Sequence, residues 1–318
     1  MEEINDIIRQ KNDTVHISVL LQEVMEGLAV KNGETFVDMT INGGGHSSAI
    51  CSALGTAGTL VGIDADSNAL VRAKKNLELS GCGATVHLVA ENFRNVKMIL
   101  SGLGIKKADK ILFDLGLSSN ELENSSRGFS FQKDEPLLMT FSDDPSKVVF
   151  TAEDILNTWD EENIAAIISG YGEERFAKRI ARRITDVRGM KPIRTTKELV
   201  EIIQNAVPNW YRSGRKLHFA TRTFQALRMA VNDEIRALEQ GLKDSWEILS
   251  PGGRIAVISF HSMEDRMVKK FFRIKSREGE GTLLVKKPII PREEEIKKNR
   301  RARSAKLRII EKNMAKQK

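Results

Sequence analysis

The chain has 318 residues, of which 41% are hydrophobic and 29% are charged, enough for a sizeable core in one or two domains. No apolar run approaches the roughly 18 residues that a membrane-spanning helix needs. The charged opening stretch, MEEINDIIRQKND, lacks the apolar core of a secretory signal. The composition excludes an integral membrane protein and predicts a globular protein of the cytoplasm.

The two cysteines, Cys51 and Cys82, have apolar or glycine neighbours and no metal-ligand spacing. We expect two reduced thiols, with neither a disulfide nor a metal site.

The net charge of +7 is located in one segment. Residues 291–318 contain 11 Lys or Arg and 4 Glu, so the rest of the chain is balanced. This segment either contacts phosphates or is a solvated tail; its charge alone does not decide between them.

Apolar runs and turn signals alternate along the first 115 residues. After a helix over 18–29, strands are predicted at 35–39, 59–63, 85–89 and 110–115. Helices are predicted between them, at 47–54, 68–79 and 94–101. Strands and helices at this spacing predict parallel βαβ units and an α/β, doubly wound sheet.

A fifth strand is predicted at 254–260, after one long helix at 223–249, and a closing strand pair at 283–285 and 307–310. Roughly 100 further residues separate strands four and five, too many for a structureless loop. They are predicted to be helical, because Thr151 and Thr195 begin capping-box patterns. We therefore expect a discontinuous domain of 1–132 and 218–318, and a helical insert at 133–217.

A predicted helix over 171–185 places Phe176, Ile180 and Ile184 on one face. Cations gather on another face and just beyond it: Arg175, Arg179, Arg182, Arg183, Arg188, Lys191 and Arg194. A basic helix face is often only solvated. Its place in an insert favours contact with a polyanion.

A glycine-rich bend follows the first strand, FVDMTINGGGH at 36–46. Such a bend lies at the carboxyl edge of an α/β sheet, where ligands bind. Asp64 ends the second strand 20 residues after Gly44, the distance at which a carboxylate commonly takes ribose hydroxyls. A nucleoside cofactor or a plain tight turn both fit the bend. The third glycine of the dinucleotide fingerprint is missing, because Ser48 occupies its position.

The end of the fourth strand, DLGLSS at 114–119, places Asp114 and Ser118 at the same edge. Class I methyltransferases that act on exocyclic amines carry a short polar motif there, which holds the amine hydrogens. Methyl transfer is an in-line displacement, so positioning and proton acceptance matter most.

The chain resembles the bacterial methyltransferase family that modifies the N4 amine of the decoding-centre cytidine in 16S rRNA. The resemblance extends from residue 16 to about 311. It rests on these motifs: H-x-x-V-L-L (16–21), D-x-T (38–40) with GGGH (43–46), D-x-D (64–66), DLGLSS (114–119), RGFSF (127–131), YGEERFAKRIAR (171–182), ATRTFQALRMAVNDE (220–234), PGGRIAVISFHSMEDRMVK (251–269) and RARSAKLRI (301–309).

This resemblance implies S-adenosylmethionine as cofactor, the small-subunit rRNA as partner, and Asp114 and Ser118 as catalytic residues. The implied cofactor contacts are Gly44, Gly45 and His46 at the methionine moiety, Asp64 at the ribose, Phe93 near the adenine, Asp114 at the strand edge, and Glu121 where the family usually has Gln. Phe93 could instead belong to the core, and His46 could cap its helix. His261 and Asp265 fit a structural hydrogen bond as well as catalysis.

The chain departs from the family pattern at several positions. Residues 135–141 read EPLLMTF where the family usually has GPLDMRM, and Asn42 and Phe219 replace a glycine and a proline. Two rival functions therefore stay open: an amine methyltransferase acting on another base, such as adenine N6 in DNA, and a non-catalytic RNA-binding assembly factor.

Overall fold

A computed structural model describes residues 18–117, 122, 125–144, 148–213 and 217–314. The chain divides into two compact units: unit 1 comprises Met1–Asn120 and Gly241–Lys318, and unit 2 comprises Glu121–Gln240. Unit 2 is wider than the insert expected at 133–217. One reason is that α12 (Thr221–Val231) packs on the helices α7 and α8 of the insert.

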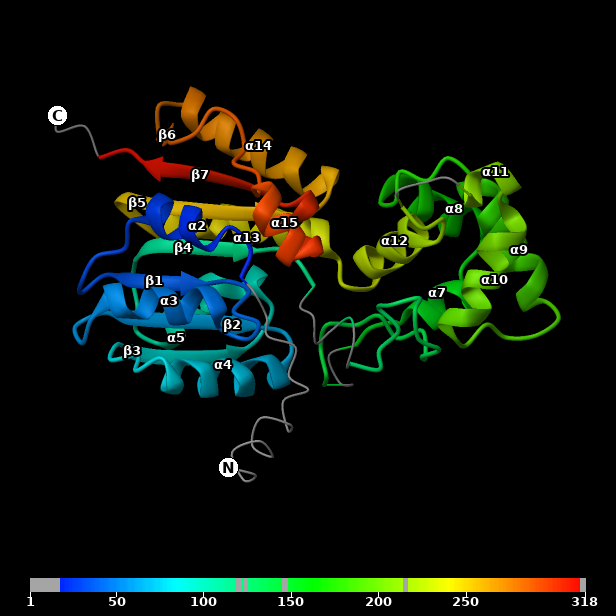
Figure 1. Cartoon of the computed structure of the whole chain (residues 1–318), viewed down its shortest axis with the longest axis horizontal. Helices are drawn as coiled ribbons and strands as arrows, with labels where there is room; N and C mark the ends of the chain where they lie inside the picture. The colour runs from blue at the N-terminus through cyan, green and yellow to red at the C-terminus, as the bar shows by residue number, and fades with distance from the viewer. Residues whose placement is uncertain (1–17, 118–121, 123–124, 145–147, 214–216, 315–318) are drawn as a thin grey trace. The chain divides into compact units, whose positions relative to one another are not determined.

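Unit 1 is built on a seven-stranded sheet of order β3-β2-β1-β4-β5-β7-β6 (Figure 1). The first five strands are parallel, and β7 is antiparallel to both β5 and β6. The predicted doubly wound α/β sheet is confirmed. The strands are β1 (Thr35–Asp38), β2 (Thr59–Asp64), β3 (Thr85–Ala90), β4 (Ala108–Asp114), β5 (Leu249–Ser259), β6 (Gly281–Leu283) and β7 (Lys306–Lys312).

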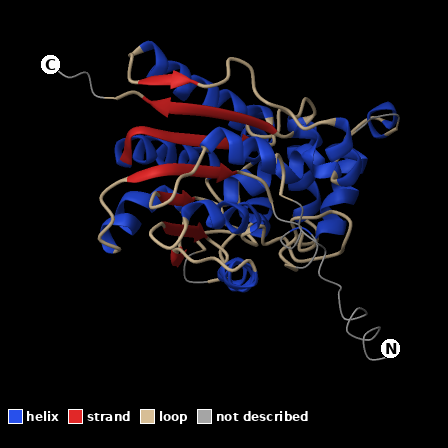
Figure 2. Cartoon of the chain, turned by 60° about the vertical axis from the view of Figure 1, so that its left-hand side comes forward, coloured by secondary structure: helices blue, strands red, loops and turns tan. Residues whose placement is uncertain are grey.

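Both faces of the sheet are covered by helices (Figure 2). Because successive strand residues point to opposite faces, Leu112 and Phe113 enter different cores. Leu112 joins the cluster formed with α2 (Leu21–Leu28), α3 (Gly45–Leu54) and α4 (Ser67–Leu79). Phe113 packs edge-on against Phe93 of η1 (Phe93–Asn95), with ring centroids 5.6 Å apart. Helix α5 (Val96–Gly102) follows η1 directly, and α13 (Glu234–Ile248) directly precedes β5.

The strand order reverses between β1 and β4. From β1 the chain proceeds outward to β2 and β3, whereas β4 and β5 lie on the other side of β1. In open α/β sheets, ligands bind outside the carboxyl ends of the strands at such a switch point. Asp38, Asp64 and Asp114, which end β1, β2 and β4, lie at this edge.

The single long helix predicted over 223–249 is wrong. The structure has two helices, α12 and α13, separated at Asn232 and Asp233, and Asp233 has a left-handed φ of 48°. The Asn232 side-chain amide donates to the Met139 carbonyl (2.7 Å) and accepts from the Phe141 backbone N–H (2.7 Å). The break therefore lies where Asn232 binds the 139–141 segment. The spacing of apolar residues over 223–249 does not reveal this contact.

The described part of the basic C-terminal segment, 291–314, is folded rather than a solvated tail, because residues 306–312 form β7 and helical turns precede them. Arg308 Nε and Lys306 Nζ lie 2.8 and 3.2 Å from the Asp265 carboxylate of α14 (Ser262–Arg277). Lys312 Nζ donates to the carbonyls of Trp246 and Leu249. The predicted closing strand pair is confirmed as β6 and β7, and α15 (Glu293–Lys298) and η3 (Arg300–Ser304) precede β7.

The expectation of two reduced cysteines is wrong for this structure. Cys51 of α3 and Cys82, which follows α4, form a disulfide with a Cα–Cα distance of 5.3 Å. The residues are 31 positions apart and meet because α3 and α4 pack side by side. The residues next to each cysteine in the sequence do not predict this proximity, because it depends on how the two helices pack.

The described part of unit 2 contains the irregular segment 125–144 and is mainly helical after it. Its short helices bury Ile164, Ile180, Ile184, Leu199 and Ile203 against one another. Both predicted capping boxes are confirmed, at Thr151 with Asp154 and at Thr195 with Glu198. Besides α12, the helices are α7 (Ala152–Thr158), α8 (Glu161–Gly170), α9 (Ala177–Arg188), α10 (Thr196–Ala206) and α11 (Asn209–Arg212). None of the helices in the described residues is long and apolar enough to cross a membrane.

Thr195→Ala is expected to lower the free energy of unfolding by about 1 kcal/mol, because the first turn of α10 loses its side-chain acceptor. Urea denaturation of the full chain, followed by circular dichroism, measures the change. Thr195→Ser keeps the hydroxyl and should stay close to wild type. An alanine variant as stable as the serine variant would contradict the assigned cap.

Candidate functional site

The glycine-rich bend joins β1 to α3 through two left-handed residues, Asn42 (φ 49°) and Gly44 (φ 76°). A Cβ on Gly44 would lie 3.2 Å from the Ala73 backbone, so glycine permits both this conformation and the close approach of α4. Gly43 is open, since the nearest atom to an added Cβ would be the Asn76 amide nitrogen at 3.9 Å. Asparagine tolerates this left-handed conformation better than most residues.

Asp64 is attached directly to this bend. Its Oδ2 accepts the Asn42 backbone N–H at 2.8 Å, and its Oδ1 accepts the Asp66 N–H at 3.0 Å. The structure therefore brings the predicted ribose carboxylate to the bend that holds Gly44 and Gly45.

Asp114 ends β4, and its backbone N–H donates to Thr40 Oγ1 at 2.7 Å. The residue is only 8% exposed. Its Oδ1 is buried with no hydrogen-bond partner among the described residues, and its Oδ2 lies 3.6 Å from His46 Nδ1. Burial, with a smaller contribution from the charge of Glu264, raises the pKa of Asp114 from 3.8 to about 7. This carboxyl group therefore exchanges its proton near neutral pH.

His46 is the neighbour of Asp114 and does not cap its helix. The N-cap of α3 is Gly44, and no side chain caps it. His46 Nε2 lies 2.9 Å from the Val19 carbonyl oxygen, which can only accept, so we assign the proton to Nε2. Burial lowers the pKa of His46 and favours the neutral ring. Its Nδ1 lone pair is thereby turned toward the Asp114 carboxyl group.

Asp38 also belongs to this buried group, although the sequence predicted no role for it. It is 2% exposed, accepts from Ser47 Oγ at 2.6 Å and from the Thr40 N–H at 3.2 Å. Burial raises its pKa from 3.8 to about 6, although the Ser47 bond and His46 act in the opposite direction. The D-x-T pattern at the end of a predicted strand was the available signal.

One side of the Phe93 ring packs against the core. The ring packs on Phe113, and a Cβ on Gly241 would meet it at 2.8 Å. The residue nevertheless stays partly exposed. This environment fits both the core alternative and a contact with an adenine.

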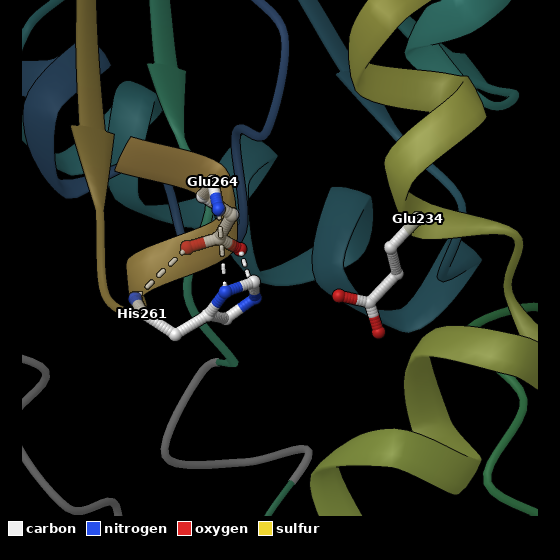
Figure 3. Close-up of side chains that lie close together, drawn as sticks. All are labelled: Glu234, His261 and Glu264. Carbon is white, nitrogen blue, oxygen red and sulfur yellow. Dashed lines mark hydrogen bonds and ion pairs between the residues drawn. The ribbon is translucent and has the colours of Figure 1, made fainter. Parts of the chain in front are cut away.

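His261 and Glu264 form a capping box at the start of α14 (Figure 3). The His261 ring accepts the Glu264 backbone N–H at 3.3 Å, and Glu264 Oε2 accepts the backbone N–H groups of Phe260 and His261. Asp265 is ion-paired with β7. His261 and Asp265 therefore both make structural contacts, at the start of α14 and with β7. Glu234, also labelled in Figure 3, belongs to unit 2 and is ion-paired there with Arg228 at 2.7 Å.

The predicted residues Ser118 and Glu121 lie outside the described residues. The 135–141 segment is described and is firmly held within unit 2. Glu135 is buried and accepts the Gly128 N–H at 3.0 Å, and Arg127 donates to the Phe141 carbonyl at 2.6 Å. Residues 135–141, which depart from the family pattern, therefore have a defined local structure.

The strand order, the glycine bend and the carboxylates at the strand ends define an α/β domain of the class I methyltransferase type. A family model described as the MraW methylase family matches residues 13–313. The chain therefore belongs to the MraW methylase family, and it is a methyltransferase.

Two relatives and one solved structure are similar to this chain. Ribosomal RNA small subunit methyltransferase H of Brevibacillus brevis is 44% identical over 312 residues, 93% of this chain and 98% of that protein. The protein of the same name from Finegoldia magna is 42% identical with the same coverage. A putative rRNA methylase from Clostridium thermocellum aligns over 94% of this chain and 99% of its own, with 14% identity and a TM-score of 0.45.

Proposed function

We propose that this chain transfers a methyl group from S-adenosylmethionine to the N4 amine of the decoding-centre cytidine of 16S rRNA, in the small ribosomal subunit. The observation that carries the proposal is Asp114, beside the glycine bend at the switch point of the sheet. Its buried Oδ1 has no hydrogen-bond partner among the residues that the structure describes. The names of the relatives from Brevibacillus brevis and Finegoldia magna support the rRNA substrate. A ribosomal substrate in turn supports a location in the cytoplasm.

The residues present fit the cofactor. Asp64 has carboxylate lone pairs for ribose hydroxyls, the backbone at Gly44 and Gly45 approaches without side chains, and the unpartnered Asp114 Oδ1 accepts a donor. When bound, S-adenosylmethionine would supply an electrophilic methyl group, whose bond to sulfur would break with the electron pair left on the sulfur.

Asp114 then acts on the amine. The N4 nitrogen gains a bond to carbon and must lose one proton, and a carboxylate with a pKa of about 7 is matched to that transfer at neutral pH. The Nδ1 atom of His46, 3.6 Å from Asp114 Oδ2, faces the carboxyl group as a hydrogen-bond acceptor once that group is protonated. Ser118 remains proposed as a second group that orients the amine.

The helical insert at 133–217 is proposed to grip the RNA through its basic helix α9. Unit 1 contributes exposed cations as well, at Lys297, Lys298, Arg300 and Arg303. These precede Lys306, which is paired with Ser259 at the carboxyl end of β5, so they lie at the edge of the sheet that carries the site. The target cytidine has to leave its stack to reach Asp114.

The experiment supplies the purified chain and labelled S-adenosylmethionine to small ribosomal subunits, to naked 16S rRNA and to duplex DNA. Label should enter the small subunits. Incorporation into adenine of the DNA instead would favour the amine methyltransferase of other specificity. RNA binding without incorporation, beside an active relative, would favour the non-catalytic assembly factor.

A further inference from the structure

A large aromatic side chain is exposed on unit 2. Trp210, in the short helix α11, is 58% exposed. The guanidinium carbon of Arg175 lies 4.3 Å from the centre of its ring, close enough for a cation–π contact. Arg175 thus lies over the indole and adds a positive charge and a second planar, delocalised group beside it. We call Trp210 and Arg175 the stacking pair.

The stacking pair stands on a rigid base. The neighbouring Tyr211 is buried, and its hydroxyl donates to the buried carboxylate of Glu174, which also accepts the Phe176 N–H at 2.9 Å. The Tyr211 ring packs edge-on against Phe176, with centroids 4.8 Å apart. These contacts fix α11 to the turn before α9, so Trp210 is held in place although it faces solvent. An exposed indole on a fixed base is typical of a contact surface rather than of a core.

A row of cations continues from the stacking pair along α9. Arg179 and Arg182 lie three positions apart on one face of α9, and Arg175 lies in the turn just before this helix. All three side chains are exposed. None of the three has an ion pair with a carboxylate among the described residues; Arg179 instead lies over the Phe176 ring at 5.6 Å. The row therefore keeps its charge available for a polyanion.

We propose that the stacking pair binds one unpaired base of the RNA substrate, while Arg179 and Arg182 bind the phosphates next to it. The proposal rests on the proposed function, because it deepens the RNA contact of the insert. Stacking on an aromatic face suits bases that are splayed out of a helix, as in loops and single strands, and adjacent cations suit the connecting backbone. Because every base has a π face, this site is tolerant of sequence.

The test measures equilibrium binding of the full chain to a labelled single-stranded RNA oligonucleotide. Trp210→Ala should weaken binding about 5- to 100-fold, since stacking contributes about 1–3 kcal/mol per base. Trp210→Phe retains a ring and should lose much less. Replacing one base after another by abasic sites should identify a nucleotide whose loss affects wild type but not Trp210→Ala. Arg179→Ala and Arg182→Ala should each reduce the salt dependence of binding.

Affinity for S-adenosylmethionine serves as the control, because the proposed cofactor contacts among the described residues lie in unit 1. Trp210→Ala with unchanged cofactor affinity and weakened RNA binding supports the stacking pair. RNA binding equal to wild type in Trp210→Ala would overturn it, as would a loss shared equally by Trp210→Phe. Because binding is read without turnover, a failure of methyl transfer would count against the proposed function and leave the stacking result standing.

Discussion

Asp114→Asn is expected to remove methyl transfer and, at the same time, to stabilise the protein at pH 8. In the folded state the pKa of Asp114 is raised from 3.8 to about 7, so the folded protein holds a proton that the unfolded chain releases between these values. Wild-type stability therefore falls as the pH rises through this window. Asparagine is neutral at every pH and avoids the cost of a buried charge. The expected gain is about 2–4 kcal/mol at pH 8.

Urea denaturation of wild type and Asp114→Asn at pH 4 and pH 8 checks the stability. The gain should be small at pH 4, where Asp114 is protonated in the folded state and still partly protonated in the unfolded chain. Asp265→Asn is a matched control of opposite sign: although burial alone raises the pKa of Asp265, its bonds to Arg308 and Lys306 hold it below the ordinary value. That variant should be less stable than wild type at pH 8. A destabilised Asp114→Asn would contradict the cost assigned to ionising this buried carboxyl group.

The activity of Asp114→Asn should fall by about 100-fold or more, the scale typical of a lost general base. In wild type, the rate of methyl transfer should rise with pH and level off above about pH 7, because the accepting form is the carboxylate. Rates measured under saturating cofactor across pH 5–9 test this. A flat profile together with an active asparagine variant would assign the proton acceptor elsewhere.

Asp64→Ala is expected to weaken binding of S-adenosylmethionine by about tenfold or more, since a charged hydrogen bond to the ribose contributes about 1.5–3 kcal/mol. The substitution also releases the Asn42 N–H, which Asp64 Oδ2 accepts at 2.8 Å. Isothermal titration calorimetry measures the affinity. Asp64→Asn keeps an acceptor oxygen for the Asn42 N–H and loses the charge. Its affinity for S-adenosylmethionine should therefore lie between those of Asp64→Ala and wild type.

Hydrogen exchange at the Asn42 amide separates the two effects of Asp64. Exchange should accelerate in Asp64→Ala and stay slow in Asp64→Asn. If both variants bind S-adenosylmethionine more weakly while the Asn42 amide of Asp64→Asn stays protected from exchange, the lost affinity belongs to the ribose contact. Unchanged affinity in both would remove Asp64 from the cofactor site.

Local patterns were sufficient to predict the core of the architecture. Alternating strands and helices predicted the parallel sheet, and the residues that end β1, β2 and β4 had to meet at one edge. Gly44, Asp64 and Asp114 were identified for this reason. The letters DLGLSS and GGGH then distinguished this chain from a dinucleotide-binding protein.

The features that escaped prediction depend on contacts between distant residues. The break between α12 and α13 occurs where Asn232 binds backbone groups about 90 positions away. The Cys51–Cys82 disulfide depends on how α3 packs against α4. The roles of Asp38 and His46 depend on burial and on neighbours such as Ser47 and Val19, which become adjacent only in the folded chain.

The most direct test of the central claim is nucleoside mass spectrometry of small ribosomal subunits after incubation with the chain and S-adenosylmethionine. The subunits should come from cells lacking this methylation, and Asp114→Asn should serve as the inactive control. We predict N4-methylcytidine at one decoding-centre position with wild type, and none with the variant. The absence of N4-methylcytidine with wild type, while a family member produces it in parallel, would contradict the proposed function.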